Sequence, residues 1–213
     1  MNERETSYPG PADFWLGHKP LVLASASTIR SSMLQQARIP HEVMPASIDE
    51  RALQKQYGAV LPAELANILA TEKSIAVSVE CPGHYVLGAD QLCVCADQIL
   101  HKASGLEDLK QKLRYLRNRE HTLISAATIS IDGEVLARCQ SEARLLVRDF
   151  SEEFLERYVA AGGVQLLQSS GGYMIEGDGV TLFDSIDGDL FTILGMPLIK
   201  ILQALRVHGL MLR

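Results

Sequence analysis

Apolar positions along the chain follow two spacings, which predict strands followed by helices. Residues 21–24, LVLA, form a short apolar run of the kind found in a strand that is buried on both faces. Apolar residues then recur at helical spacing at Ile29, Met33 and Ala37. Ser27 directly precedes this segment and is a natural N-cap. This part of the sequence therefore predicts a strand, a tight turn and a helix.

The next segments repeat the two patterns. Residues 41–45 predict a short strand, and residues 47–51 a charged loop or helix start. Pro62 suits the first turn of a long helix. The apolar positions of this helix predict a buried face made of Leu65, Ile68 or Leu69, Ala76 and Val79. Residues 85–89 predict a second buried strand that ends at Asp90, with a further strand-like run over 92–95.

The second half of the chain contains a predicted hairpin between helices. Residues 121–130 and 134–147 alternate as strands do, and Asp132-Gly133 is a suitable turn between them. Helices are predicted over 105–117, from a Ser151 cap to about residue 160, and over 198–207. Strands that alternate with helices favour an α/β fold, and the hairpin implies that its sheet is mixed.

Composition and charge narrow the class of protein. The 213 residues are 47% hydrophobic, enough for a core in one domain or two closely joined lobes. A net charge of −6 argues against a general binder of nucleic-acid polymers or membrane surfaces. No apolar run is long enough to cross a bilayer, and the polar residues 1–20 lack a signal peptide's hydrophobic core. A cytoplasmic protein with four reduced cysteines is therefore expected.

The first predicted helix is a candidate anion site. Its first-turn amides and dipole face the carboxyl end of the preceding strand, next to Ser25 and Ser27. Arg30 lies in that first turn, where the helix dipole disfavours a cation. Its presence suggests a phosphate that uses both the amides and the guanidinium. The alternative is a capped helix with a solvated arginine.

Two more charged residues stand beside apolar segments. Asp90 follows an apolar strand, where an acid is costly unless it is paired or binds a cation. It is the most functional-looking carboxylate of the chain, although an aspartate that caps a turn is the alternative. Lys73 lies at the edge of the long helix's buried face, and its position alone favours a snorkelling side chain over one aimed at a site.

Together these segments resemble the Maf family of nucleoside triphosphate pyrophosphatases, from Leu21 to about Gly209. The resemblance rests on seven motifs in order: LASAS-x-x-R at 23–30, Asp49-Glu50, Lys73, GADQ at 88–91, Lys102, EGDGVTLF at 176–183 and GMPL at 195–198. It implies an elongated mixed α/β fold in which residues 21–213 form a single domain of two lobes around a cleft, after an N-terminal extension at 1–20. It also implies a homodimer that hydrolyses a nucleoside triphosphate to the monophosphate and pyrophosphate.

The resemblance also implies roles for particular residues. Arg30, Lys73 and Lys102 would converge on the triphosphate, with Ser25, Ser27 and the helix amides at one end. Glu50 and Asp90 would hold Mg²⁺ or Mn²⁺ through hard oxygen ligands. Asp90 would also be the base that takes the water's proton, and the two roles compete for the same lone pairs.

Base choice follows from three further positions. Gln91 and Glu176 look like the family branch that acts on 7-methyl-GTP rather than the branch that acts on dTTP and UTP. That branch typically has a tryptophan where this chain has Ile29, so an aromatic platform is missing unless Trp15 or Tyr173 supplies it.

Two departures leave the local geometry open. Thr28 stands where the family usually has proline, and residues 101–103, His-Lys-Ala, replace a usual Gly-Lys-Pro. Together with Ile29 they leave room for another function: a weakly active nucleotide-binding regulator of septum formation.

Overall fold

A mixed seven-stranded sheet forms the centre of the molecule, with strand order β2-β1-β3-β5-β6-β7 and β4 paired with β3. The computed structural model describes residues 14–58 and 60–213. The strands are β1 (Leu21–Leu23), β2 (His41–Val43), β3 (Val86–Cys95), β4 (Gln98–Leu100), β5 (Glu120–Ile131), β6 (Glu134–Val147) and β7 (Phe183–Asp187). The helices are α1 (Thr28–Gln36), α2 (Glu50–Gln56), α3 (Pro62–Glu80), α4 (Leu106–Leu116), α5 (Glu152–Gly162), α6 (Leu190–Ile193) and α7 (Leu198–Val207), with 3₁₀ segments η1 (Gly163–Gln168) and η2 (Asp178–Leu182).

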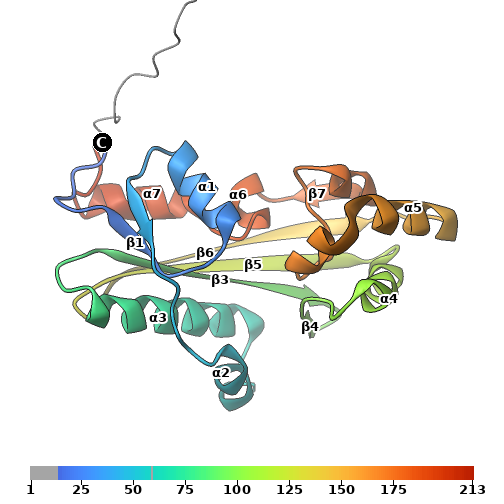
Figure 1. Cartoon of the computed structure of the whole chain (residues 1–213), viewed down its shortest axis with the longest axis horizontal. Helices are drawn as coiled ribbons and strands as arrows, with labels where there is room; N and C mark the ends of the chain where they lie inside the picture. Colours follow the sequence, from blue (N-terminus) through green and yellow to red (C-terminus); the bar gives the residue numbers. More distant parts are fainter. Residues whose placement is uncertain (1–13, 59) are drawn as a thin grey trace, which may run out of the picture.

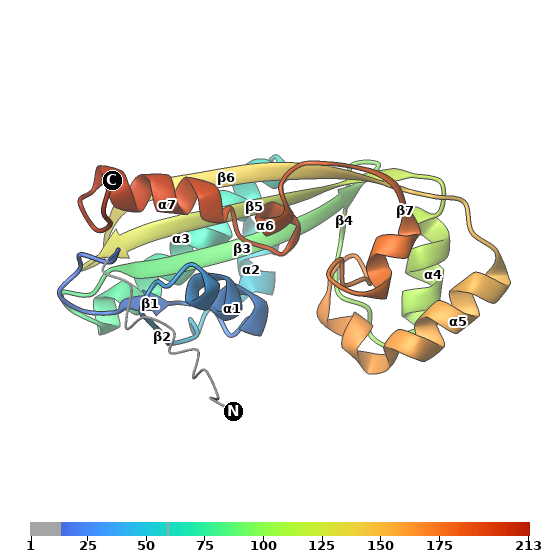
Figure 2. The same cartoon turned by 90° about the horizontal axis from the view of Figure 1, so that it is seen from above.

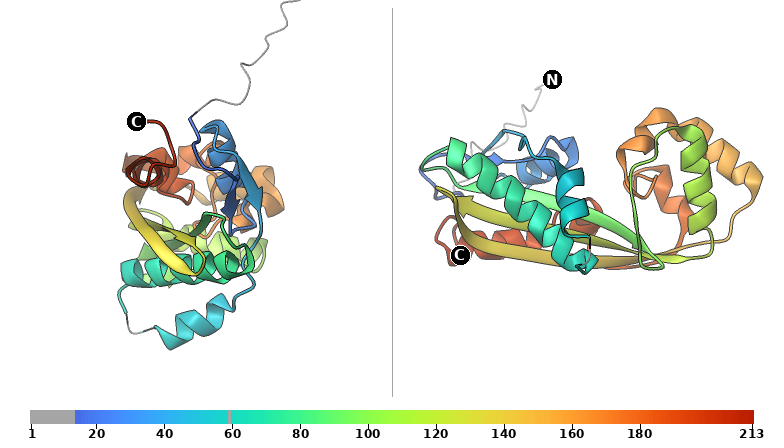
Figure 3. Two further views of the ribbon diagram at one scale, coloured as in Figure 1. Left: turned by 90° about the vertical axis from the view of Figure 1, so that its left-hand side faces the viewer. Right: turned by 90° about the horizontal axis from the view of Figure 1, so that it is seen from below.

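Three long strands, β3, β5 and β6, run the length of an elongated molecule and connect two parts (Figure 1 and Figure 2). The main body holds α1 and α7 on one face of the sheet and α3 on the other, and α2 lies beside α3 (Figure 3). The end lobe holds α4, α5 and the 3₁₀ segments around its own hydrophobic cluster, which includes Leu109, Leu145 and Leu155. The fold is therefore mixed α/β, as the sequence predicts.

Most of the predicted elements are confirmed, and local chemistry explains them. Ser27 caps α1 by accepting a hydrogen bond from the backbone nitrogen of Arg30, and Ser151 caps α5 in the same way. Asp132 and Gly133 have positive φ angles of 51° and 82°, which suit the tight turn between β5 and β6. All four cysteines are free. No helix in the described ranges is long and apolar enough to cross a bilayer.

The prediction that a strand ends at Asp90 is wrong. Strand β3 continues from Val86 to Cys95, and Asp90 lies opposite Ala126 in its antiparallel pairing with β5. An acid can occupy the middle of a buried strand because cations from other elements reach it, as shown below. Because Asp90 lies in the middle of β3, it does not cap a turn.

The predicted buried face of α3 is also partly wrong. Leu65 and Leu69 are buried, but Val79 is 64% exposed, and the face that meets the sheet carries Lys73 and Ser74 instead. Ser74 Oγ donates to the carbonyl of Val86 at 2.9 Å, so this polar residue is satisfied against the sheet. Hydrophobicity alone could not identify a helix face whose polar side chains find partners across the interface.

The chain segment before β1 packs on the far end of the main body. Trp15 forms a β-bridge with Met211 and packs against the hydrophobic cluster that includes Leu21 and Leu205. The rest of the expected extension, residues 1–13, lies outside the described residues.

Candidate active site

Three charged side chains from α2, α3 and β3 meet at the centre of the molecule. Lys73 Nζ donates to Asp90 Oδ1 at 2.6 Å and lies 2.9 Å from Glu50 Oε1. Gly88 allows α3 to lie close to β3, because its backbone packs so tightly against the carbonyl of Ala70 that a Cβ would not fit. Lys73 is only 8% exposed, so the snorkelling interpretation is wrong. Its ammonium group is instead the bridge between two carboxylates.

Burial sets the electrostatics of Asp90. The side chain is almost completely enclosed, and desolvation raises the pKa of its carboxyl group above the ordinary value. The charges of Lys73 and Arg30 oppose this shift but do not cancel it. A carboxylate with a raised pKa accepts a proton more readily than an exposed aspartate does, which suits a general base.

Arg30 binds the protein rather than solvent. Its Nη1 donates to the carbonyl of Ala89 at 2.8 Å and to Ser25 Oγ at 3.0 Å, and its Nε donates to the carbonyl of Gly195 at 2.9 Å. Burial lowers the pKa of the guanidinium, and the nearby carboxylates of Asp90 and Glu50 oppose this effect. The solvated-arginine alternative is therefore wrong. Much of the side chain's donor capacity is already used to hold α1, β3 and the loop after α6 together.

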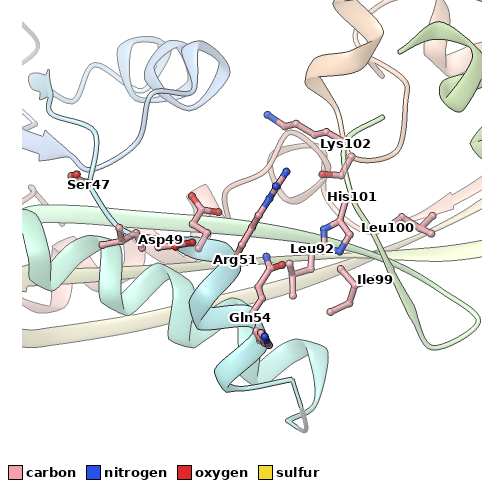
Figure 4. A pocket seen from close by; sticks show the side chains of 13 residues that line it. Ser47, Asp49, Arg51, Gln54, Leu92, Ile99, Leu100, His101 and Lys102 are labelled. Atoms are coloured by element: carbon pink, nitrogen blue, oxygen red, sulfur yellow. The ribbon is translucent and has the colours of Figure 1, made fainter. Parts of the chain in front are cut away.

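A pocket of about 1180 Å³ opens beside Glu50, between the main body and the end lobe. Figure 4 shows Arg51, from α2, and Lys102, from the segment after β4, extending into this space from opposite sides. Lys55, His101 and Ser170 also line it. The structure thus places Lys102 and Glu50 at one pocket, while Lys73, Asp90 and Arg30 continue from Glu50 into the interior.

The predicted base-binding residues do not form one cluster. Gln91 Nε2 donates to the carbonyls of Thr192 and Ile193 at 2.9 and 3.0 Å and lies 3.2 Å from Ser125 Oγ, so this amide holds α6 to the sheet. Glu176 is exposed in the turn before η2 and does not line the pocket.

The two proposed substitutes for an aromatic platform are engaged elsewhere. Ile29 is partly buried against the main-body cluster, which also holds Trp15. Tyr173 is 5% exposed in the end lobe, and its hydroxyl shares a hydrogen bond of 2.5 Å with His121 Nε2. Neither aromatic ring lines the pocket, and Ile29 does not line it either.

The serines of the first motif are arranged around the start of α1. Ser27 Oγ is 3.3 Å from the backbone nitrogen of Arg30, and Ser25 Oγ is 3.3 Å from that of Ser27. Both hydroxyls act as acceptors here and keep their own hydrogens available as donors.

Sequence reasoning missed two cations of the pocket, Arg51 and Lys55. The available signal was their spacing: on a helix that begins at Glu50, residues four apart share a face. A charged segment of this kind is usually a solvated helix surface, so only the position of α2 beside the pocket distinguishes it.

The donor set is compatible with a divalent cation. Glu50 and Asp90 both reach the same Lys73 nitrogen, so two hard carboxylate ligands already converge. Across residues 14–58 and 60–213, no group of three His, Cys, Asp or Glu residues is placed to enclose a metal ion. Magnesium is commonly bound through one or two carboxylates, with water and substrate phosphates as the other ligands, and the pair fits that pattern.

Comparison with known proteins identifies the family. Residues 20–208 match the Maf family, which is described as "Maf-like protein". A protein of Rhodopseudomonas palustris named nucleoside triphosphate pyrophosphatase is 44% identical over 92% of this chain and 98% of its own length. A protein of Mesorhizobium japonicum named 7-methyl-GTP pyrophosphatase is 41% identical over 89% of this chain and 96% of its own.

Among solved structures, a dITP/XTP pyrophosphatase of Mycobacterium abscessus matches 61% of this chain and 74% of its own, with 12% identity and a TM-score of 0.35. That similarity is too low to carry an argument. The sequence relatives and the family match, which extends over most of the chain, are sufficient: this protein belongs to the Maf family.

Proposed function

We propose that this nucleoside triphosphate pyrophosphatase acts on a guanine nucleotide and prefers 7-methyl-GTP, which it cleaves to the monophosphate and pyrophosphate. The general activity follows from relatives of that name that match nearly the whole chain. The observation that carries the site assignment is the bridge from buried Lys73 to Asp90 and Glu50 at the edge of the pocket. Relatives named 7-methyl-GTP pyrophosphatase support the finer specificity.

Asp90 is the residue proposed to accept the proton of the attacking water. Hydrolysis at the α-phosphorus needs a base near the phosphate chain and positive charge on its oxygens. The raised pKa of the Asp90 carboxyl group favours proton transfer to it, and Lys73 fixes the orientation of that group through a hydrogen bond of 2.6 Å. Arg30, Lys73 and Lys102 supply the positive charge.

We further propose that Glu50 and Asp90 hold Mg²⁺ or Mn²⁺. When bound, the ion would add positive charge at the phosphate oxygens and lower the pKa of a bound water. In that state Lys73 would exchange part of its contact with the carboxylates for contact with phosphate. Direct binding of Mn²⁺, followed by electron paramagnetic resonance, tests this assignment, and Glu50→Gln should weaken the binding.

Recognition of the base is assigned to Glu176 and Gln91. A carboxylate can accept hydrogen bonds from both N1–H and N2–H of a guanine edge, and it favours the positive charge that N7-methylation adds. Because Gln91 Nε2 is bonded to the α6 carbonyls, its Oε1 is the atom left to accept a hydrogen bond. Trp15 packs in the main-body cluster and Tyr173 is buried beside His121, so neither ring is free to give the methylated cation a cation–π contribution. We therefore expect a modest preference.

The test is kcat/KM for 7-methyl-GTP, GTP, dTTP and UTP on the wild type, Glu176→Gln and the nearby control Asp178→Asn. We expect kcat/KM for 7-methyl-GTP to exceed that for GTP by less than roughly tenfold, which is the factor that a cation–π contact would add. The pyrimidine nucleotides should be poor substrates. Glu176→Gln should reduce the methyl preference more than it slows hydrolysis, and the control should not. A wild type that prefers dTTP, or unchanged selectivity in Glu176→Gln, would contradict the proposed specificity.

The alternative of a weakly active regulator has no structural observation in its favour. It would be supported by nucleotide binding without release of pyrophosphate from any of the four triphosphates, measured in a coupled phosphate assay with Mg²⁺.

A further inference from the structure

We infer that Arg51, assisted by Lys55, binds the pyrophosphate leaving group in the outer part of the pocket. This inference rests on the proposed function and adds an assignment to it: which side of the catalytic cluster receives the two terminal phosphates. It concerns two residues of α2 that belong to none of the sequence motifs described above.

The position of Arg51 follows from that of Glu50. Glu50 is the first residue of α2, and its carboxylate lies 2.9 Å from Lys73 Nζ, so the chain enters the helix directly beside the catalytic cluster. The next residue, Arg51, extends into the pocket toward Lys102, which enters from the opposite side on the segment after β4 (Figure 4). A phosphate chain that begins at Asp90 and passes Glu50 would therefore meet these two cations next.

The lining of the outer pocket holds more cations than acids. Within the described residues, Arg51, Lys55 and Lys102 form no salt bridge with any carboxylate. Of the two acids in the lining, Glu50 pairs with Lys73, and Asp49 keeps its charge while its Oδ1 accepts a hydrogen bond from the backbone nitrogen of Ala52 at 3.0 Å. With Glu50 paired to Lys73, three cations face one remaining acid in the lining, and this excess of positive charge in a chain of net charge −6 favours an anionic ligand.

The proposed reaction produces negative charge that the cations of the outer pocket would stabilise. The water oxygen forms a bond to the α-phosphorus, the bond from that phosphorus to the bridging oxygen breaks, and the electron pair leaves with the pyrophosphate. The water proton goes to Asp90. Negative charge thus grows on the leaving group, where a guanidinium offers paired donors that match phosphate oxygens.

Calorimetric titration with inorganic pyrophosphate tests the inference without relying on turnover. The proteins are the wild type, Arg51→Gln, Lys55→Gln and Arg38→Gln, the last being an exposed arginine just beyond α1 and outside the pocket. Loss of one charge-assisted contact should weaken pyrophosphate binding about tenfold or more in Arg51→Gln and less in Lys55→Gln. Guanosine monophosphate binding should stay within about twofold, since the monophosphate would not contact Arg51 or Lys55, and Arg38→Gln should match the wild type.

Two results would overturn the inference. One is wild-type affinity for pyrophosphate in both α2 variants, and the other is a selective loss of monophosphate binding, which would place the nucleoside end in this pocket. Arg51→Lys distinguishes lost charge from lost geometry, because it keeps the charge but not the paired donors. Failure of the proposed function has a different signature: no pyrophosphate released by the wild type, with Arg51-dependent pyrophosphate binding intact.

Discussion

Arg30 and Arg51 both lie in the first turn of a helix, but they make different contacts. Arg30 is partly buried and donates to the carbonyls of Ala89 and Gly195 and to the hydroxyl of Ser25. Arg51 is exposed, extends into the pocket, and forms no salt bridge within the part of the chain that the structure describes. The inner guanidinium organises the protein, and the outer one is free to meet a ligand.

This difference shows that the charge of a residue does not by itself reveal its role. Buried charges at the centre of the fold are used twice, because they hold elements together and also set the potential at Asp90. The exposed cations of the pocket, Arg51, Lys55 and Lys102, form no salt bridge within residues 14–58 and 60–213. Substitutions in the inner cluster should therefore change stability and turnover together, whereas those in the outer wall should change turnover and binding alone.

The largest effect is expected from Asp90→Asn. An amide cannot take the water's proton and is a poor metal ligand, so kcat should fall about a hundredfold or more. The asparagine is nearly the same size, and the fold should persist. The control is Asp49→Asn, because asparagine also caps helices well and should preserve α2. Steady-state kinetics with circular dichroism decides the matter, and near-wild-type turnover in Asp90→Asn would remove Asp90 from the mechanism.

Arg30→Ala should lower both the stability of the protein and its turnover. It removes three hydrogen bonds and leaves two backbone carbonyls without their partner, so the free energy of unfolding should fall by about 2 kcal/mol or more. It should also raise KM and lower kcat. Urea denaturation measures the first effect. An Arg30→Ala protein as stable as the wild type would mean that these bonds contribute little.

His121 shows what burial does to a titratable group that has no counter-charge. It is 1% exposed, its Nδ1 has no hydrogen-bond partner among residues 14–58 and 60–213, and burial lowers its pKa to about 4. The unfolded chain binds a proton near pH 6.5 and the folded protein does not, so stability should be lost as pH falls from about 6.5 towards 4. The slope contributed by this group is about 1.4 kcal/mol per pH unit in that window. Denaturation of wild type and His121→Phe across the window measures it, and parallel pH curves would refute the assignment.

The smallest of these effects is expected from Lys102→Ala. Its side chain is exposed and lines the pocket, so the thermal midpoint should not change. Loss of one cation that contacts phosphate should lower kcat/KM about tenfold. Kinetics beside a melting curve tests the contrast with Arg30→Ala. If Lys102→Ala keeps full activity, the His-Lys-Ala segment does not bring this lysine to the substrate.

The sequence predicts the elements of this fold well because their signals are local. The cap at Ser27, the turn at Asp132-Gly133 and the apolar run of β1 each depend on neighbouring residues. The site is different. Lys73 contacts an aspartate 17 positions away, and Arg30 a carbonyl 165 positions away. Periodicity alone therefore predicts only a snorkelling lysine at the edge of the buried helix face.

The sequence does not identify Arg51 as a site residue, because an exposed charged helix is ordinary. Its charge makes a solvated helix surface the natural interpretation, and that interpretation is correct as far as burial goes, since α2 has no buried residue. Only the position of the helix beside the pocket gives the exposed cation a candidate role.

The most direct test of the account is hydrolysis of 7-methyl-GTP in ¹⁸O-labelled water, with products analysed by mass spectrometry. If water activated by Asp90 attacks the α-phosphorus and pyrophosphate leaves towards Arg51 and Lys102, the label should appear in the nucleoside monophosphate and not in the pyrophosphate. Label in the pyrophosphate, or release of a diphosphate and single phosphate, would contradict the account.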